Sequence, residues 1–143
     1  VAGVLLLIEA ARRITHCVRA VDTVARFGGD EFVVILGELG TDENGSAVQA
    51  SIVAEKIRVS LAEPYYLTLQ KKEKTKPIAV VHRCTSSIGV TLFVDYQECH
   101  ETLLKEADAA MYQAKNNGQN QISFLKNGVK MPENQSLDYF SVH

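Results

Sequence analysis

Residues 23–36 read TVARFGGDEFVVIL, and this stretch organises the predicted fold. Two runs of strand-forming residues, Thr23–Phe27 and Glu31–Leu36, stand on either side of the turn Gly28-Gly29-Asp30. A glycine-containing link of this length between two apolar runs is typical of a β-hairpin. The sequence therefore predicts a hairpin whose tip consists of two glycines and an acid.

The turn carries residue types that suit a phosphate and a metal ion. Gly28 and Gly29 place no side chain at the tip, so a ligand can approach the backbone closely. Asp30 and Glu31 follow directly. Because neighbouring strand side chains point to opposite faces, only one of these acids can face a ligand at the tip directly. The residues alone leave two interpretations open: a phosphate-plus-metal site, or a glycine turn with solvated acids.

Helical and strand periodicities alternate around the hairpin. In chain order we expect a helix over Leu5–Val18, the hairpin, a helix from an N-cap at Ser46 to Ala62, strands in Tyr65–Gln70 and Ile78–Phe93, a helix through Leu103–Ala114 with Gly118 as its cap, and a strand at Gln121–Leu125. This order predicts an α/β (α+β) fold with a largely antiparallel central sheet flanked by helices.

Composition limits the class of protein. The chain has 143 residues, of which 46% are hydrophobic and 22% charged, as expected of one globular domain. Fifteen basic and seventeen acidic residues give a net charge of -2, which removes the electrostatic case for nucleic acid or a membrane surface as partner. The cysteines Cys17, Cys84 and Cys99 have no CxxC spacing, which favours a reducing, cytoplasmic location.

The segment RFGGDEF, residues 26–32, resembles the signature of the GGDEF family, the diguanylate cyclases that join two GTP molecules into cyclic di-GMP. Further blocks resemble the family in the same order: Leu5–Arg13 (LLLIEAARR), Ala54–Arg58 (AEKIR), Ser86–Val90 (SSIGV), and Asp108–Lys115 (DAAMYQAK) followed by Asn117–Asn120. The resemblance implies a palm-like nucleotide-cyclase fold with a ferredoxin-like core. We expect residues 1–125 to form this domain, and the sequence after the last strand, residues 126–143, to form a loosely ordered C-terminal tail.

The resemblance also implies a mechanism. In this family the 3′-hydroxyl of one GTP attacks the α-phosphate of another and displaces pyrophosphate, assisted by Mg²⁺ or Mn²⁺. Asp30 and Glu31 are then the catalytic acids and metal ligands, and Gly28 and Gly29 let the nucleotide lie against the backbone. Lys115 matches the lysine that contacts the triphosphate, although its position without the family would favour a solvated lysine at a helix end. One GTP per domain implies a catalytic homodimer.

A second site is implied by Arg19-Ala20-Val21-Asp22, an RxxD segment separated from Gly28 by five residues. Family members carry an inhibitory cyclic di-GMP site at this offset, and Lys56 lies where another basic contact to that ligand is common. An arginine fork and a carboxylate can both pair with guanine. Without the family, Arg19 and Asp22 would be interpreted as a surface ion pair at a helix end.

The chain departs from the family pattern at three places. Val4 stands where an Asp usually accepts hydrogen bonds from guanine, and Gln119 stands where a basic residue contacting phosphate is common. The family's opening strand, which lies centrally in the sheet and carries a DxD-like segment with another metal ligand, is absent. Because its neighbours would be left with unpaired backbone groups, we expect an N-terminally incomplete domain that cannot form the full fold as a monomer and is inactive by itself.

Two functions remain open at this stage. The leading hypothesis is a diguanylate cyclase domain with GTP as substrate, cyclic di-GMP as product and inhibitor, and a second copy as partner. The alternative is a degenerate domain that binds cyclic di-GMP through Arg19 and Asp22, or binds a protein, without catalysis. Neither hypothesis includes nucleic acid or direct membrane contact by this segment.

Overall fold

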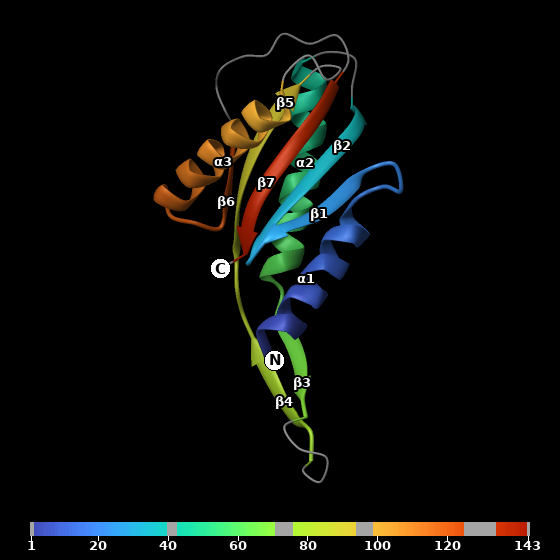
Figure 1. The fold of residues 1–143 in the computed structure, drawn as a ribbon, viewed down its shortest axis with the longest axis vertical. Coiled ribbons are helices and arrows are strands. Elements are labelled where there is room, and N and C mark those ends of the chain that lie inside the picture. The colour runs from blue at the N-terminus through green and yellow to red at the C-terminus, as the bar shows by residue number, and fades with distance from the viewer. Residues whose placement is uncertain (1, 40–42, 71–75, 94–98, 125–133, 143) are drawn as a thin grey trace.

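A computed structural model describes residues 2–39, 43–70, 76–93, 99–124 and 134–142. Its elements in chain order are α1 (Ala2–Cys17), β1 (Thr23–Gly28), β2 (Glu31–Leu39), α2 (Glu43–Ala62), β3 (Tyr65–Leu69), β4 (Ile78–His82), β5 (Ser86–Phe93), α3 (His100–Asn116), β6 (Gln121–Phe124) and β7 (Asn134–Val142). A five-stranded sheet has the order β1-β2-β7-β5-β6, and β3 and β4 form a separate two-stranded sheet (Figure 1).

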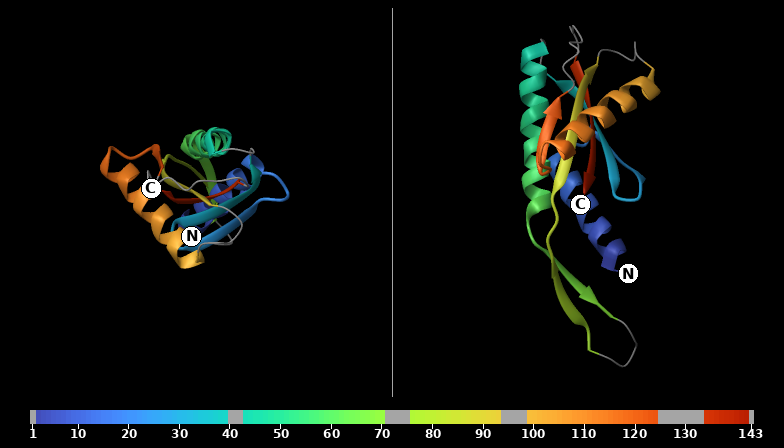
Figure 2. Two further views of the ribbon diagram at one scale, coloured as in Figure 1. Left: turned by 90° about the horizontal axis from the view of Figure 1, so that it is seen from above. Right: turned by 90° about the vertical axis from the view of Figure 1, so that its left-hand side faces the viewer.

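The sheet lies between two helical layers. Helices α1 and α2 cover one face and α3 covers the other, and the β3–β4 hairpin extends away from these layers (Figure 2). All strand pairs of the larger sheet are antiparallel except β5 with β6, which is parallel. The expected fold class, a largely antiparallel sheet flanked by helices, is confirmed.

The predicted hairpin is present, and it forms for the expected reason. Strands β1 and β2 pair antiparallel, with Arg26 opposite Phe32 and Gly28 opposite Glu31, and a bulge lies between these two pairs. Gly28 and Gly29 have φ angles of 152° and 53°, in the region where a residue with a Cβ atom is strained. The turn therefore requires glycine at both positions.

The most consequential difference from the sequence-based expectation concerns the C-terminal segment. Residues 126–143 were expected to form a loose tail, yet Asn134–Val142 form β7 in the centre of the sheet. This strand runs antiparallel to both β2 and β5 (Figure 1). The prediction of a loose tail is wrong for these residues. The strand is formed by pairing with β2 and β5, which are distant in the sequence, and residues near 134–142 do not reveal such pairing.

The expectation that a monomer lacks its central strand is also wrong. One 143-residue chain forms a continuous sheet, because β7 occupies the place between β2 and β5 where the family's opening strand was expected. The backbone groups of β2 and β5 that face this place find partners along β7. A domain end at residue 125 would separate β7 from the sheet whose centre it forms, and residues 125–133 themselves lie outside the described residues.

Two smaller boundaries also differ. The single strand expected over Ile78–Phe93 is divided into β4 and β5, which belong to different sheets. Helix α2 begins at Glu43, so Ser46 is a fully buried residue within the helix and not its N-cap. The third helix ends as predicted, because Asn117 caps α3 and Gly118 follows with φ 119°.

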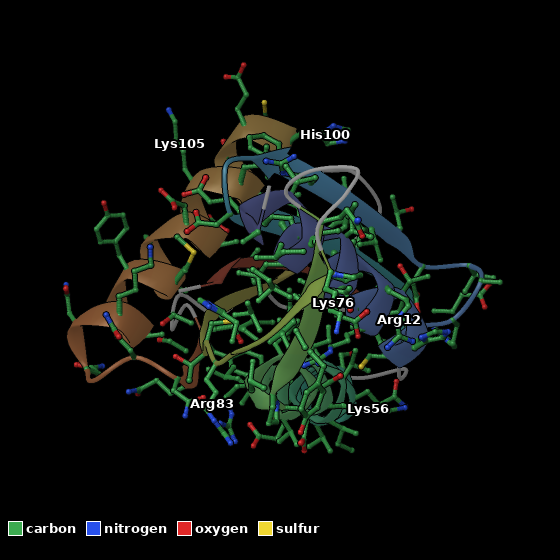
Figure 3. All side chains as sticks on the ribbon, turned by 90° about the horizontal axis from the view of Figure 1, so that it is seen from below. Arg12, Lys56, Lys76, Arg83, His100 and Lys105 are labelled. Carbon is green, nitrogen blue, oxygen red and sulfur yellow. The ribbon has the colours of Figure 1, made fainter. Side chains whose placement is uncertain are left out.

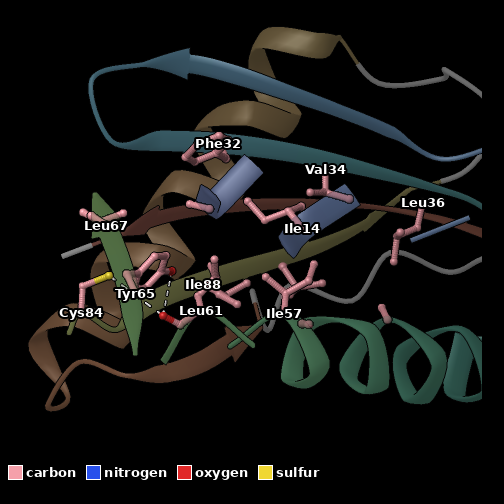
Figure 4. Packing of buried hydrophobic residues seen from close by; sticks show 14 residues of the cluster. Ile14, Phe32, Val34, Leu36, Ile57, Leu61, Tyr65, Leu67, Cys84 and Ile88 are labelled. Carbon is pink, nitrogen blue, oxygen red and sulfur yellow. Dashed lines mark hydrogen bonds between the residues drawn. The ribbon is translucent and has the colours of Figure 1, made fainter. Parts of the chain in front are cut away.

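Alternation along the strands divides the apolar residues between the two faces. Phe32, Val34 and Ile88 are fully or almost fully buried and pack with Ile14 of α1 and Ile57 of α2 (Figure 4). The residues between them point to the opposite face, where they meet α3. The buried residues of this second cluster are Val33, Phe93, Leu103, Ala107 and Met111.

One arginine joins α1 to the corner between α2 and β3. Arg13 Nη1 donates to the carbonyls of Ser60 and Glu63 at 2.8 Å each, and Nη2 donates to Pro64 O at 2.7 Å. Its guanidinium also lies 3.7 Å from the ring centroid of Tyr65. Ser60 lies in the last turn of α2, and Glu63 and Pro64 directly follow the end of the helix. Arg13 therefore holds the C-terminal end of α2, where carbonyls lack donors within the helix, together with the corner that follows it.

Helix α3 packs closely against the sheet at Gly89 of β5. A Cβ atom added to Gly89 would lie 2.1 Å from Ala107 O and 2.2 Å from Met111 N. Both contacts are with helix backbone, which cannot move aside as a flexible side chain can. The absence of a side chain at Gly89 therefore sets the distance between α3 and the sheet.

We predict that Gly89→Ala destabilises the protein by at least about 1–3 kcal/mol, because α3 must shift away from β5. The free energy of unfolding in urea measures this loss. Gly37→Ala is the matched control: a Cβ atom there meets no atom within 4 Å, so a change within about 0.5 kcal/mol is expected. Equal losses for the two variants would contradict the close packing at Gly89.

The central position of β7 predicts slow hydrogen exchange. Because its amides are enclosed by two neighbouring strands, peptides covering residues 134–142 should exchange about as slowly as peptides covering β2 and β5. Hydrogen–deuterium exchange followed by mass spectrometry measures this. Exchange of these residues at the rate of an unstructured peptide, with β2 still protected, would contradict the strand assignment.

Candidate functional site

The hairpin tip presents its backbone and one acid to solvent. Gly28, Gly29 and Asp30 are exposed, whereas Glu31 is half-buried at the start of β2. Arg26 Nε donates to Gly29 O at 2.9 Å and so braces the turn from β1. The turn is thus held in place by a hydrogen bond, and its backbone is exposed. A ligand that lies against the backbone requires this exposure.

Glu31 lies on the sheet face that α3 covers. Val33, two residues further along β2, packs in the α3 cluster, and alternate residues share a face. Burial raises the pKa of the Asp108 carboxyl on α3, the negative charge of Glu31 raises it further, and the positive charge of Lys115 opposes both effects. Glu31 of β2 and Lys115 of α3 therefore each lie close enough to Asp108 to act on its charge.

Asp108 is a member of this group that the sequence does not single out, since it lies within the segment Asp108–Lys115 that resembles the family as a whole. A usable signal existed, because Asp108 and Lys115 are seven residues apart and two helical turns place them on one face of α3. Lys115 is half-buried in the last turn, with Nζ 5.7 Å from the ring centroid of Tyr112.

The acids at the tip suit a hard divalent cation. Among the described residues no cluster of three or more His, Cys, Asp or Glu side chains is arranged to hold a metal ion. Mg²⁺, however, is commonly bound by one or two carboxylates together with substrate phosphates and water. The exposed Asp30 and half-buried Glu31 fit a site of this kind, which is completed by the ligand and not by the protein.

The second predicted site forms a closed local network. Arg19 N and Gly37 N donate to the Asp22 carboxylate at 2.8 and 3.1 Å, and Arg19 Nη2 lies 3.3 Å from Asp22 Oδ1. Arg19 Nη2 also donates to Gly37 O. The Asp22 side chain is only 2% exposed. The network ties the turn between α1 and β1 to β2, which is the structural role expected of a local ion pair.

The charge state of Asp22 depends on this network. Burial by itself raises the pKa of its carboxyl, but the hydrogen bonds from Arg19 and from Gly37, with the charge of Arg19, outweigh burial and lower the pKa. The carboxylate form is therefore the one that the fold stabilises.

Arg19, Asp22 and Lys56 line one groove of about 400 Å³ between α1, β2 and α2. Its other walls are largely apolar, with Val18 and Ile52 among them. Lys56 and Arg12 lie on the same side of the molecule, away from His100 and Lys105 on α3 (Figure 3). The structure thus brings together all three residues of the second predicted site.

A smaller pocket lies beside the hairpin tip and was not expected from the sequence. It has a volume of about 220 Å³ between α1 and the β1–β2 hairpin. Its lining residues are Val4, Leu7, Ile8, Ala11, Arg26 and Phe32.

Among the described residues, no helix is both long and apolar enough to cross a membrane.

We predict that Asp22→Asn lowers the free energy of unfolding by about 1–3 kcal/mol at pH 7, because charge-assisted hydrogen bonds are weakened. The folded-state pKa lies below the unfolded value of about 3.9. The stabilisation is therefore complete above that value and disappears as the pH falls through the folded-state pKa.

Urea unfolding at several pH values tests this dependence. The wild type and Asp22→Asn should converge in stability below about pH 4, and the exposed Asp30→Asn should change stability by at most about 0.5 kcal/mol. A difference that grows on acidification would show that the Asp22 carboxylate is not the stabilising form.

The sequence is similar to those of known diguanylate cyclase domains. A family model described as "Diguanylate cyclase, GGDEF domain" matches residues 2–121. The bifunctional diguanylate cyclase/cyclic di-GMP phosphodiesterase MucR of Pseudomonas aeruginosa is 35% identical over 135 residues, covering 94% of this chain and 17% of that protein. Diguanylate cyclase A of Treponema denticola is 37% identical over 128 residues, covering 90% of this chain and 30% of that protein.

The fold agrees with that of a solved structure. The crystal structure of the GGDEF domain of YfiN, also called TpbB, from Pseudomonas aeruginosa superimposes with a TM-score of 0.66 at 30% identity. The match covers 89% of this chain and 70% of that one. By contrast, the chain spans less than a third of the length of MucR and of diguanylate cyclase A.

Proposed function

Because the chain belongs to the GGDEF family of diguanylate cyclase domains, we propose that it is the catalytic part of an enzyme that condenses two GTP molecules into cyclic di-GMP with release of pyrophosphate. The observation that carries this proposal is the intact glycine turn with Glu31 placed on the α3 face, beside Asp108 and Lys115. A metal-binding acid and a phosphate-binding cation from different elements thus serve one site.

Each residue has a role that follows from its position. Asp30 and Glu31 would hold Mg²⁺ or Mn²⁺, which when bound favours deprotonation of the attacking 3′-hydroxyl and neutralises phosphate charge. Gly28 and Gly29 admit the triphosphate to the backbone. The Lys115 ammonium, on the same face as Glu31, pairs with phosphate oxygens. Since one such site accommodates one GTP, the reaction requires a second copy that presents its own nucleotide.

Product inhibition is proposed for the groove of Arg19, Asp22 and Lys56. A guanine base is recognised by an arginine fork and a carboxylate together, and both groups border the groove. Arg19 donates to Gly37 O in the absence of ligand. Binding of cyclic di-GMP therefore requires the Arg19 guanidinium to exchange this carbonyl for the ligand. The free cysteines support a cytoplasmic location for such an enzyme.

The full-length protein incubated with GTP and Mg²⁺ should form cyclic di-GMP. Glu31→Gln and Lys115→Ala should each lower kcat/KM at least about 100-fold, because they remove a metal ligand and a phosphate contact. Lys105→Ala is the matched control on the exposed side of α3, and its activity should be that of the wild type. Equal activity of Lys115→Ala and Lys105→Ala would contradict the assigned role of Lys115.

The same assay separates catalysis from ligand binding alone. Absence of cyclic di-GMP in the wild type, together with cyclic di-GMP binding that Arg19→Ala abolishes, would establish a non-catalytic receptor and overturn the proposed enzyme. If the protein is a product-inhibited enzyme, Arg19→Ala should instead keep its initial rate and lose the decline in rate as product accumulates.

A further inference from the structure

We propose that Arg58 and Asn120 form a clamp between α2 and the turn after α3, and that this clamp positions Lys115 for its contact with the substrate triphosphate. Arg58 and Asn120 are then positioning residues, which act through Lys115. The proposal rests on the proposed function, because it assigns a support to the lysine of that site. Helices α2 and α3 lie on opposite faces of the sheet (Figure 2), and the clamp joins them at the edge formed by β6.

Two backbone hydrogen bonds close the last turn of α3 around Lys115. Gly118 N donates to Lys115 O at 3.4 Å. Gln119 N donates to Ala114 O at 3.0 Å. With Gly118 at φ 119°, this is the Schellman arrangement of a helix end. Because helix ends fray where such bonds are lost, the place of Lys115 in the last turn depends on the turn that follows it.

The turn is more strained than a helix end of this kind requires. One residue with a positive φ angle is enough for it, yet Gln119 and Asn120 also have positive φ angles, of 62° and 49°. Both residues carry a Cβ atom, which in this conformation lies too close to the following carbonyl oxygen. Such conformations persist only where surrounding contacts hold them. Side chains that contact residues 117–120 are therefore needed to keep the turn closed.

Two side chains supply these contacts. Gln121 Nε2, at the start of β6, donates to Asn117 O at 2.8 Å and to Gln119 O at 3.3 Å. Arg58 Nη1, from α2, donates to Asn120 Oδ1 at 2.8 Å. Because a guanidinium only donates, the Asn120 amide must present its oxygen to Arg58. The turn is thus held by its own strand and by a helix on the other face of the sheet.

The Arg58 guanidinium is oriented before it reaches the turn. Its Nε donates to Glu55 Oε2 at 2.9 Å, and its Nη2 donates to Glu55 Oε1. A carboxylate that binds two nitrogens of the planar fork fixes its orientation. The third nitrogen, Nη1, is the one that reaches Asn120. The side chain of Arg58 is only 21% exposed, so the contact with the turn is partly shielded from solvent.

Packing on the sheet holds α3 only as far as Ala114, the last of its buried residues. Lys115 directly follows and is half-buried. From this residue onward, the path of the backbone depends on the closed turn and, through Asn120, on Arg58. A displacement of about 1 Å caused far from the reacting atoms can lower a rate about 100-fold. Loss of the clamp should therefore affect the triphosphate contact, although Arg58 belongs to α2.

The test removes each partner of the clamp in the full-length protein. Arg58→Ala deletes the donor, and Asn120→Gly deletes the acceptor but leaves a residue that adopts φ 49° without strain. Each variant should lower kcat/KM for cyclic di-GMP formation at least about tenfold. Each should weaken binding of a non-hydrolysable α,β-methylene GTP analogue with Mg²⁺, measured by calorimetry, to a similar degree. The urea midpoint checks folding, and relief of strain should keep it near the wild-type value for Asn120→Gly.

Arg12→Ala is the matched control, because Arg12 is bound to Glu9 as Arg58 is bound to Glu55. Its Nε and Nη2 donate to the Glu9 carboxylate at 2.9 and 2.7 Å, whereas Nη1 contacts His16 of the same helix. Rate and affinity of Arg12→Ala should be those of the wild type. Equal losses for Arg12→Ala and Arg58→Ala would trace the effect to a surface ion pair and overturn the proposal.

A double variant tests whether the clamp acts through Lys115. In the Lys115→Ala background, Asn120→Gly should change the Kd of the analogue by less than about twofold, because the side chain to be positioned is absent. The same substitution in the wild-type background should have its full effect. A tenfold loss in both backgrounds would indicate a general effect on the fold and contradict the positioning role.

The outcomes also separate this proposal from the one on which it rests. Analogue binding that depends on Lys115 and on the clamp, without any cyclic di-GMP formed, would overturn the cyclase function and leave the positioning role intact. Wild-type kcat/KM in folded Arg58→Ala and Asn120→Gly proteins would overturn the clamp and leave the cyclase function intact. Failure of the wild-type protein to bind the analogue would overturn both.

Discussion

The pairing of β7 with both β2 and β5 is the interaction on which the rest of the structure depends. In the order β1-β2-β7-β5-β6, this is the strand through which the described strands of the hairpin half and of the β5–β6 half are hydrogen-bonded into one sheet. Its neighbours β2 and β5 each meet it along most of their length. Without β7, two rows of backbone groups would face each other with no partner inside the core, and each buried unpaired group costs about 1–3 kcal/mol.

The candidate active site spans this junction. Glu31 belongs to β2 and is paired in register with Ser141 of β7, whereas Asp108 and Lys115 belong to α3, which rests on β5 through the bare backbone of Gly89. The relative position of acid and lysine is therefore set by the width of one strand and by one glycine contact. A shift of β7, or of α3 at its contact with Gly89, would separate Glu31, the proposed metal ligand, from Lys115, the proposed phosphate contact. This would happen even though every site residue were present.

Helix α1 borders both the pocket beside the hairpin tip and the groove of Arg19, Asp22 and Lys56. Its first turns border the pocket beside the hairpin tip, and its last residues lead into the network of Arg19 and Asp22 at the far end of β1. Between them, Arg13 fixes the helix to the end of α2. The pocket beside the hairpin tip and the proposed product groove thus share one helix, which is held to the core by hydrogen bonds from Arg13 to three carbonyls and by its contact with Tyr65.

The sequence by itself determined what depends on near neighbours. Glycines at positions 28 and 29 require a tight turn, apolar periodicity predicts the three helices, and Gly118 ends the last of them, because each signal acts within a few residues. The family resemblance assigned the acids of the tip and the residues of the second site. Only the tertiary structure decided that residues 134–142 form the central strand, that Asp108 joins Glu31 and Lys115, and that Val4 borders an apolar pocket with Arg26. Those relations join segments distant in the chain, and they exist only once the sheet has closed around β7.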